Sequence, residues 1–353
     1  KSTEVRIIVA SGSVNTLTDS AKNNDDNYPD NTDAENAVIK CKDGSQVTLS
    51  GSGTLNITAN GKNGIKSGAT TDEEGEAWMT ISDLTLNITA SVNDAINAEQ
   101  LLNVTSGNIT ISAGDDAIHS DYILNIGSEN GEGPVINIKS CHEGLEAATL
   151  NVYSGNITIH ASDDCLNAAN SDLSGYAFSI NIYGGTLVMD TTSGDGVDSN
   201  GSLTISGGTL VVWSANTADN QPLDADGTIT ISGGTVLAAG GSNGMGMNIS
   251  ASQPYVIYGS TSGMGGGMGG NFPGGGRGNG NFPDRSNQSG DIPAPPSGGF
   301  TGDTNDTKGG FTGGNPYGGF PGNAGSSVSI SSGSTIALKD SSGNTVYSGE
   351  ALC

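Results

Sequence analysis

Two observations predict an all-β fold, a parallel β-helix solenoid of about nine coils with three strands per coil. The first is an acidic stretch around one apolar residue that recurs down the chain, as in Asp115-Asp116-Ala117-Ile118 and Asp163-Asp164-Cys165-Leu166. Intervals of 21 to 31 residues separate these apolar residues, which are Val38, Ile65, Ile96, Ile118, Leu145, Leu166, Val197, Leu223 and Met247.

The second observation is a pair of short strand patterns joined by a glycine turn before each acidic stretch. One example is Leu102-Asn103-Val104 and Ile109-Thr110-Ile111, which flank Gly107. Apolar and polar residues alternate with period two, as expected for strands with one buried face. Glycine suits the corner because it adopts positive φ at little cost. The outward asparagines of the first strand predict an amide ladder along the axis, formed by Asn103, Asn125, Asn151 and Asn181.

Composition divides the chain into three parts. We expect the solenoid over residues 1–258, an insert over 259–325, and terminal strands over 326–353 that complete the solenoid. Gly, Pro, Asn and Ser dominate the insert, which is typical of a disordered linker. We nevertheless expect the insert to be ordered, because five phenylalanines could anchor it: Phe272, Phe282, Phe300, Phe311 and Phe320.

The charge balance limits the partners. With 37 acidic and 12 basic residues the net charge is −25, so the surface repels nucleic acid and anionic lipid, and we exclude both. No run of 18 apolar residues exists, so we expect no membrane span. No signal peptide is visible, but Val5-Arg6-Ile7-Ile8-Val9 already has a strand pattern, so we expect the native chain to begin earlier.

The cysteines predict no disulfide framework. Cys41, Cys141, Cys165 and Cys353 are too few and too scattered for one. Cys165 occupies an inward position of the repeat, where a small buried side chain fits. A bridge between Cys141 and Cys165 is left open, and so is the redox compartment.

The outward acidic residues fall into columns. In a β-helix the same position on successive coils stacks about 4.8 Å apart. Adjacent like charges at that spacing repel by roughly 3 kcal/mol at an effective dielectric constant of about 20. One column, two residues before the apolar position, contains Asp94, Asp116, Glu143, Asp164 and Asp195. Another, one residue after it, contains Asn97, His119, Glu146, Asn167, Asp198 and Asp224.

A hard divalent cation would neutralise these columns. Calcium binds oxygen ligands at about 2.4 Å, so one ion can reach two stacked carboxylates. The predicted calcium ligands are Asp94, Asp115, Asp116, Glu143, Glu146, Asp163, Asp164, Asp195, Asp198 and Asp224. The alternative is a solvated acidic face whose carboxylates splay apart, accept backbone hydrogen bonds or have raised pKa values. His119 and His142 lack a thiolate pattern beside them, so we do not expect zinc.

The repeated acidic units, turns such as Ser206-Gly207-Gly208-Thr209, and the Gly/Met/Pro-rich insert resemble a group of secreted bacterial carbohydrate-binding proteins. The resemblance covers residues 30 to 350. It implies a right-handed, pectate-lyase-like β-helix, calcium in the coil stack, and affinity for cellulose and acidic plant polysaccharides such as polygalacturonate. It also implies a secreted, extracellular or cell-surface location. The sequence departs from the pattern at its N-terminal edge and at Cys353, which leaves the end caps open.

Related folds cleave such polymers by calcium-assisted β-elimination, so a lyase is a less favoured alternative. A lyase needs a cation and a base beside the proton that it removes. Alignment of Lys139 with Thr110 points Lys139 outward and makes it a weak candidate for the catalytic base. Basic residues are rare, so the sequence favours non-catalytic polysaccharide binding.

Flat side chains suit neutral sugar. Trp213 lies in the outward column of His160, and Tyr183 lies near a corner, so these three are the candidate carbohydrate-binding residues. Packing at a corner or against a second subunit is the alternative for Trp213. The second class of function is a structural surface fibre, a homo-oligomer or filament built by stacking of open solenoid ends.

Overall fold

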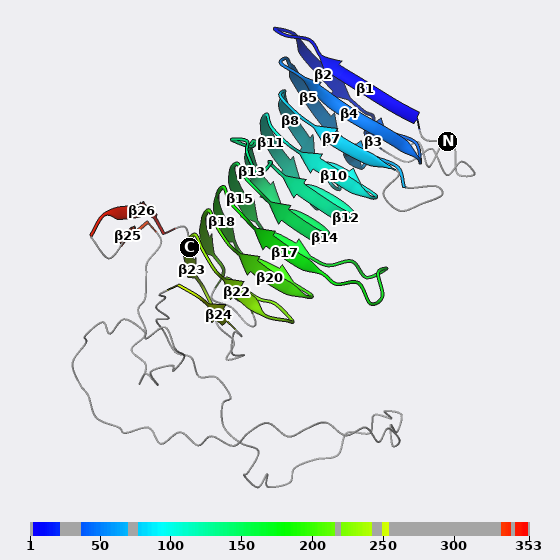
Figure 1. Ribbon diagram of the computed structural model, residues 1–353. Helices are drawn as coiled ribbons and strands as arrows, with labels where there is room; N and C mark the ends of the chain where they lie inside the picture. Colours follow the sequence, from blue (N-terminus) through cyan, green and yellow to red (C-terminus); the bar gives the residue numbers. More distant parts are fainter. Residues whose placement is uncertain are drawn as a thin grey trace, which may run out of the picture.

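The computed structural model is all-β, and its strands stack in parallel along one axis (Figure 1). Its described residues contain no helix, so none is long and apolar enough to cross a membrane. This arrangement is consistent with the expected parallel β-helix or a similar solenoid. The described residues are 3–21, 37–69, 77–215, 220–241, 249–253, 333–339 and 343–351.

Fifteen strands form the longer parallel sheet. Its main path runs through β1 (Thr3–Val9), β4 (Ser45–Gly51), β7 (Trp78–Ile81), β10 (Leu101–Val104), β12 (Ile118–Ile126), β14 (Leu145–Val152), β17 (Ser179–Ile182), β20 (Ser202–Ile205), β22 (Ile229–Ile231) and β24 (Ile249–Ala251). The acidic stretches supply β3 (Ala37–Lys40), β6 (Asn63–Lys66), β9 (Ile96–Ala98), β16 (Leu166–Ala168) and β19 (Val197–Ser199).

Nine strands form the second parallel sheet. They are β2 (Val14–Thr18), β5 (Thr54–Ala59), β8 (Thr85–Ala90), β11 (Asn108–Ala113), β13 (Val135–Cys141), β15 (Asn156–Ala161), β18 (Thr186–Thr191), β21 (Thr209–Trp213) and β23 (Thr235–Ala239). Burial alternates along these strands, with Leu55 and Ile57 of β5 buried and Asn56 between them partly exposed. Each repeat therefore sends its apolar residues into one continuous core.

The register confirms most of the predicted alignment. Ile118 pairs with Ile96 on one side and Leu145 on the other, and Leu166 pairs with Val197. At the start of the stack the alignment is wrong by one residue, because Ile39 rather than Val38 pairs with Ile65. The expected position Met247 lies outside the described residues.

In two places the acidic strand that ends one repeat and the strand that begins the next repeat form one continuous strand. In β12 and β14 the acidic strand continues into the next strand, with a register shift between Ser120 and Ile123. This continuity joins both strand positions into the longer sheet. The predicted amide ladder lies on it, with Asn125 donating to Asn103, and Asn151 donating to Asn125, both at 2.9 Å.

Small residues are required where neighbouring repeats approach closely. A Cβ atom on Gly144 would lie 2.3 Å from the backbone oxygen of Cys165, one repeat away. The equivalent residues of neighbouring repeats, Ala117 and Cys165, are fully buried. Cys41, Cys141 and Cys165 are free and buried, and Cys353 lies outside the described residues.

The C-terminal strands correct the prediction that residues 326–353 complete the solenoid. Strands β25 (Thr335–Lys339) and β26 (Thr345–Glu350) pair antiparallel in a sheet of their own. This hairpin packs against the outer face of the nine-stranded sheet, where Ala351 joins a buried cluster with Val211 and Trp213 (Figure 1). The insert, residues 259–325, lies outside the described residues.

Candidate functional site

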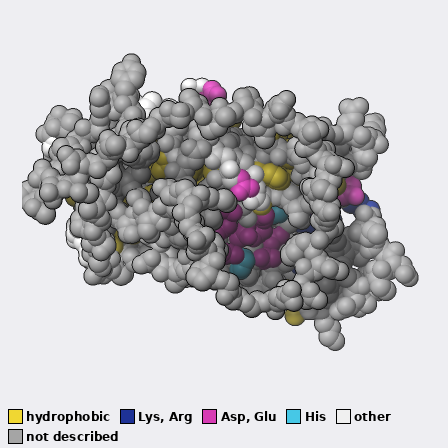
Figure 2. Space-filling model, turned by 90° about the horizontal axis from the view of Figure 1, so that it is seen from below, with side chains coloured by type: hydrophobic (Ala, Val, Ile, Leu, Met, Phe, Trp, Pro, Cys, Tyr) yellow, Lys and Arg dark blue, Asp and Glu magenta, His cyan; other side chains and the backbone are white. Residues whose placement is uncertain are grey.

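The predicted acidic columns lie at the bend where the nine-stranded sheet passes into the longer sheet. Backbone pairing places His119 beside Asn97 and Glu146, and Asn167 beside Glu146 and Asp198, as expected. Figure 2 shows Asp and Glu side chains gathered in one patch with histidine beside them. We call this surface the acidic ridge: Asp94, Asp115, Asp116, Glu143, Glu146, Asp163, Asp164, Asp195, Asp198 and Asp224.

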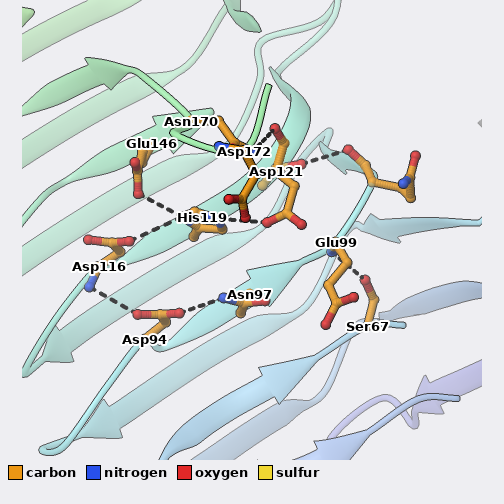
Figure 3. Close-up of polar contacts among 12 residues, drawn as sticks. Ser67, Asp94, Asn97, Glu99, Asp116, His119, Asp121, Glu146, Asn170 and Asp172 are labelled. Atoms are coloured by element: carbon orange, nitrogen blue, oxygen red, sulfur yellow. Dashed lines mark hydrogen bonds and ion pairs between the residues drawn. The ribbon is translucent and has the colours of Figure 1, made fainter. Parts of the chain in front are cut away.

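His119 is the centre of one part of the ridge, which we call the upper half: Asp94, Asp115, Asp116 and Glu146 (Figure 3). Its Nδ1 atom lies 2.7 Å from Glu146 and 3.1 Å from Asp116, and its Nε2 atom lies 2.9 Å from Asp121. Burial alone would lower the pKa of His119, but the hydrogen bonds to these three carboxylates outweigh it and raise the pKa to about 12. The upper half therefore contains its own cation at neutral pH.

The buried acids of the upper half also accept hydrogen bonds from neighbouring N–H groups. Asp94 accepts a hydrogen bond of 2.6 Å from the Asn97 amide and one of 3.3 Å from the Asp116 backbone N–H. Burial and the Asp116 charge raise the pKa of Asp94, and burial raises the pKa of Asp116 to about 6. These contacts match part of the alternative hypothesis of a solvated acidic face, in which carboxylates accept backbone hydrogen bonds at the bend.

The lower half consists of the other acids of the ridge, Glu143, Asp163, Asp164, Asp195, Asp198 and Asp224, and concentrates negative charge. Burial raises the pKa of Asp164 to about 8, and Asp198, Asp163 and Glu143 add to the effect. Burial likewise raises the pKa of Glu143 to about 7 and that of Asp198 to about 6. Each shift means that the ionised form is poorly stabilised by its surroundings. A bound cation would reverse that effect.

Asn167 gives a separate indication of a cation in the lower half. Its Nδ2 atom donates to Glu143 at 2.8 Å, and only 7% of the residue is exposed. Its Oδ1 atom is buried and has no hydrogen-bond partner among the described residues, and the same is true of Asn97 Oδ1 in the upper half. An unpaired buried oxygen is costly. A hard cation ligated by oxygen would satisfy it.

The carboxylate spacing also fits a cation. Asp195, Asp198 and Asp224 offer only oxygen ligands, and one carboxylate oxygen of each lies within 4.8 Å of the others. Calcium binds such ligands at about 2.3 to 2.6 Å, and one ion between them is within reach of all three. In two further groups, Asp116/His119/Glu146 and His142/Glu143/Asp163, an imidazole replaces one carboxylate. A fourth group, Asp94/Asp115/Asp116 in the upper half, also offers only oxygen ligands. Two all-oxygen groups therefore fit calcium, one in each half of the ridge.

An aromatic cluster beside the ridge was not predicted. Tyr176 lies edge-on to Tyr122, with ring centroids 6.3 Å apart, and packs against Phe178 at 5.5 Å. Its hydroxyl group lies 3.1 Å from Thr149 Oγ1. Asn170, in the same connection between β16 and β17, donates to the Asp121 backbone oxygen at 2.9 Å, which brings this segment to the ridge (Figure 3). A loop carries no repeat pattern, so its position had no signal in the sequence.

The three predicted carbohydrate-binding residues differ in exposure. His160 and Trp213 lie in one column on either side of Asp190, as predicted. Trp213 is outward as expected but only 2% exposed, because the C-terminal hairpin covers it, so it is not a surface platform for sugar. Half-exposed His160 contacts Asp190 through Nδ1. Tyr183 is 45% exposed. One face of its ring stacks on Tyr153, with centroids 5.0 Å apart and planes 14° apart.

Lys139 is outward, but its predicted register is wrong. Asn137 rather than Lys139 pairs with Thr110, and Lys139 falls at the register shift between Ile138 and Ser140. Its side chain lines a groove on the nine-stranded sheet together with asparagine, threonine and serine, and no carboxylate lines this groove among the described residues. The structure therefore does not bring Lys139 together with the acidic ridge, as a calcium-assisted lyase would require.

The family comparison agrees with a sugar-binding surface. The family model of carbohydrate-binding domain-containing proteins matches residues 1–244. The chain belongs to this family. The match covers the acidic ridge and most of the strand stack of this carbohydrate-binding protein. No curated protein and no solved structure matches the chain.

Proposed function

We propose that this carbohydrate-binding protein is an extracellular, non-catalytic protein that binds acidic polysaccharide, such as polygalacturonate, through calcium on the lower half of the acidic ridge. The observation that carries the proposal is the buried, unpaired Oδ1 atom of Asn167 among acids whose pKa values are raised. The finer fold that we infer is a right-handed, pectate-lyase-like β-helix, which places one ligand group per repeat along the ridge.

The residues of the lower half would have different roles in binding calcium. Asp195, Asp198 and Asp224 form the all-oxygen group of this half, and Asn167 adds an amide oxygen one repeat away from Asp198. Glu143 orients the Asn167 amide by accepting its N–H, and Oδ1 is left without a hydrogen-bond partner among the described residues. Calcium bound there would supply positive charge that a uronate carboxylate can share. Without that charge, a protein of net charge −25 would repel an acidic polymer.

The upper half also contains an all-oxygen group, Asp94/Asp115/Asp116, but its need for calcium would be smaller. His119 already places positive charge against three carboxylates of this region, and a calcium ion prefers oxygen to imidazole nitrogen. Tyr122 and Tyr176 lie beside this half and offer partly exposed ring surface on which sugar rings can pack. A cellulose-type neutral chain is the alternative ligand, with exposed Tyr183 as its stacking residue.

The test is binding of polygalacturonate by calorimetry with calcium and with EDTA. We expect binding in calcium, little binding through the ridge in EDTA, and release of calcium in stoichiometric amount on chelation. Asp198→Asn should weaken calcium binding and lower the calcium-dependent affinity. Glu132→Gln, on an exposed turn, makes the same charge change away from the ridge and should behave as wild type. Equal calcium binding by the Asp198→Asn protein would overturn the assignment.

A fibre is the second candidate function, and exposed apolar side chains on two strands favour it. Ile8 of β1 and Val14 of β2 are each 71% exposed. Exposed apolar side chains promote association with another chain. Light scattering should then show growth of particles with protein concentration, and Ile8→Lys should suppress it. A size that does not change with concentration argues against the fibre.

A further inference from the structure

The outer face of the nine-stranded sheet carries a polar groove that is separate from the acidic ridge. Strands β5, β8 and β11 form its floor, and Lys139 of β13 lies at one end. The register stacks its side chains in two rows. Asn56, Asn87 and Thr110 form one row, and Thr58, Thr89 and Ser112 form the other.

The groove differs from the rest of the molecule in charge. Strands β2, β5, β8, β11, β13 and β15 contain no Asp or Glu, although the chain as a whole has a net charge of −25. Lys139 is the one Lys or Arg in these six strands, and it is exposed. An anion that the ridge repels therefore meets no carboxylate and one ammonium group on these six strands.

The polar groups of the groove are partly ordered in advance. Asn87 Nδ2 donates to Asn56 Oδ1 at 2.8 Å, which fixes the two amides relative to each other. Each amide has more donors and acceptors than this bond uses, so both can also contact a ligand. Ordering before binding lowers the entropy cost of binding. A row of hydroxyl groups beside these amides is chemically suited to sugar hydroxyls.

The spacing of the rows matches a polymer rather than a small compact ligand. Neighbouring strands lie about 4.8 Å apart, so the four strands from β5 to β13 offer equivalent groups over about 14 Å. An extended oligosaccharide presents hydroxyl groups at a similar repeat. Lys139 stands at the end of these rows, where a charged substituent of the same chain would meet it.

We propose that this groove is a second, calcium-independent subsite for uronate-bearing oligosaccharide. The sugar carboxylate pairs with the Lys139 ammonium group, and the ring hydroxyls bond to the stacked asparagine, threonine and serine side chains. The charge-assisted bond to Lys139 selects acidic over neutral sugars. This inference rests on the proposed binding of acidic polysaccharide and adds a site with a different requirement for metal.

The experiment uses the full chain in EDTA, so that the calcium-dependent site does not contribute to binding. Calorimetry with tri-galacturonate is compared with calorimetry using the neutral galactose trisaccharide. We expect the acidic trisaccharide to bind more tightly, and Lys139→Gln to weaken it by about tenfold, as loss of one charge-assisted bond predicts. Lys339→Gln removes the same charge from the exposed end of β25 and should have no effect.

A second variant reports on the amide row. Asn87→Ala removes the bond to Asn56 and should weaken both trisaccharides, whereas Lys139→Gln should affect only the acidic one. Melting curves establish that each variant is folded. Absence of binding in EDTA, or equal affinities of the Lys139→Gln and wild-type proteins for the acidic trisaccharide, would overturn the assignment of the groove as a binding site. Either result would leave calcium-dependent binding at the ridge standing, because that binding depends on Asp198 and not on Lys139.

Discussion

Asp164→Asn tests the electrostatics of the acidic ridge most directly. Asp164 Oδ1 accepts the Asp195 backbone N–H at 2.6 Å, and asparagine keeps that oxygen while removing the charge. Burial and neighbouring acids raise the Asp164 pKa from an ordinary 3.8 to about 8. The folded protein therefore holds this proton more tightly than the unfolded chain does. Without calcium, the wild-type protein should lose stability as pH rises from about 4 to about 8.

The size of the effect follows from the pKa shift. One pKa unit corresponds to about 1.4 kcal/mol, so a shift of about four units would give about 6 kcal/mol for an isolated group. Neighbouring carboxylates share protons and water screens part of the charge, so we expect about 2 to 3 kcal/mol between pH 5 and pH 8.5. Asparagine carries no proton to lose, so the variant should escape this contribution.

The assay is urea unfolding at pH 5, pH 7 and pH 8.5 in EDTA. Wild-type and Asp164→Asn proteins should differ little at pH 5, and the variant should be the more stable at pH 8.5. Saturating calcium should reverse the order, because the ion needs the carboxylate. A difference that does not change with pH, or a variant that is less stable at pH 8.5 in EDTA, would refute the reasoning.

Three further changes test other parts of the structure. His119→Gln should lower the free energy of unfolding at pH 7 by about 3 kcal/mol, because three carboxylates lose their cation. Urea unfolding should show a smaller loss of this free energy at pH 5. Gly144→Ala should lower the melting temperature by several degrees through its contact with Cys165, and an unchanged value would contradict the close packing. Trp213→Phe should leave polysaccharide affinity in calorimetry within about twofold, because the hairpin covers the indole; a tenfold loss would restore Trp213 as a platform.

The repeat itself could be predicted because its physical cause is local. One inward apolar residue per acidic stretch and one glycine corner per repeat fix the register, and Ile96, Ile118 and Leu145 pair as their sequence spacing indicates. Errors arose where the spacing changes. Ile39 replaces Val38 at the start of the stack, and Lys139 lies two residues beyond Asn137, the residue that pairs with Thr110. A shift of two residues, as at Lys139, keeps each side chain on the same face of the sheet, so a pattern of period two cannot detect it.

Interactions between distant segments could not be predicted. Trp213 has the alternation of an outward residue, and its burial depends on a hairpin more than a hundred residues later in the chain. The contacts of His119 with Asp121 and Glu146 depend on side-chain direction, which the sequence gives only as column membership. The acidic columns themselves were found, because stacked positions follow from the repeat alone.

The histidine also explains why the two halves of the ridge should differ in their need for metal. His119, Glu146, Asn167 and Asp198 occupy one column on successive strands. At about 4.8 Å per strand, His119 lies about 14 Å from Asp198, which exceeds the Debye length of about 8 Å at physiological ionic strength. Its charge stabilises Glu146 but is largely screened at Asp198. Asp195, Asp198 and Asp224 therefore require a cation of their own, and the buried, unpaired oxygen of Asn167 belongs to the residue that pairs with Asp198.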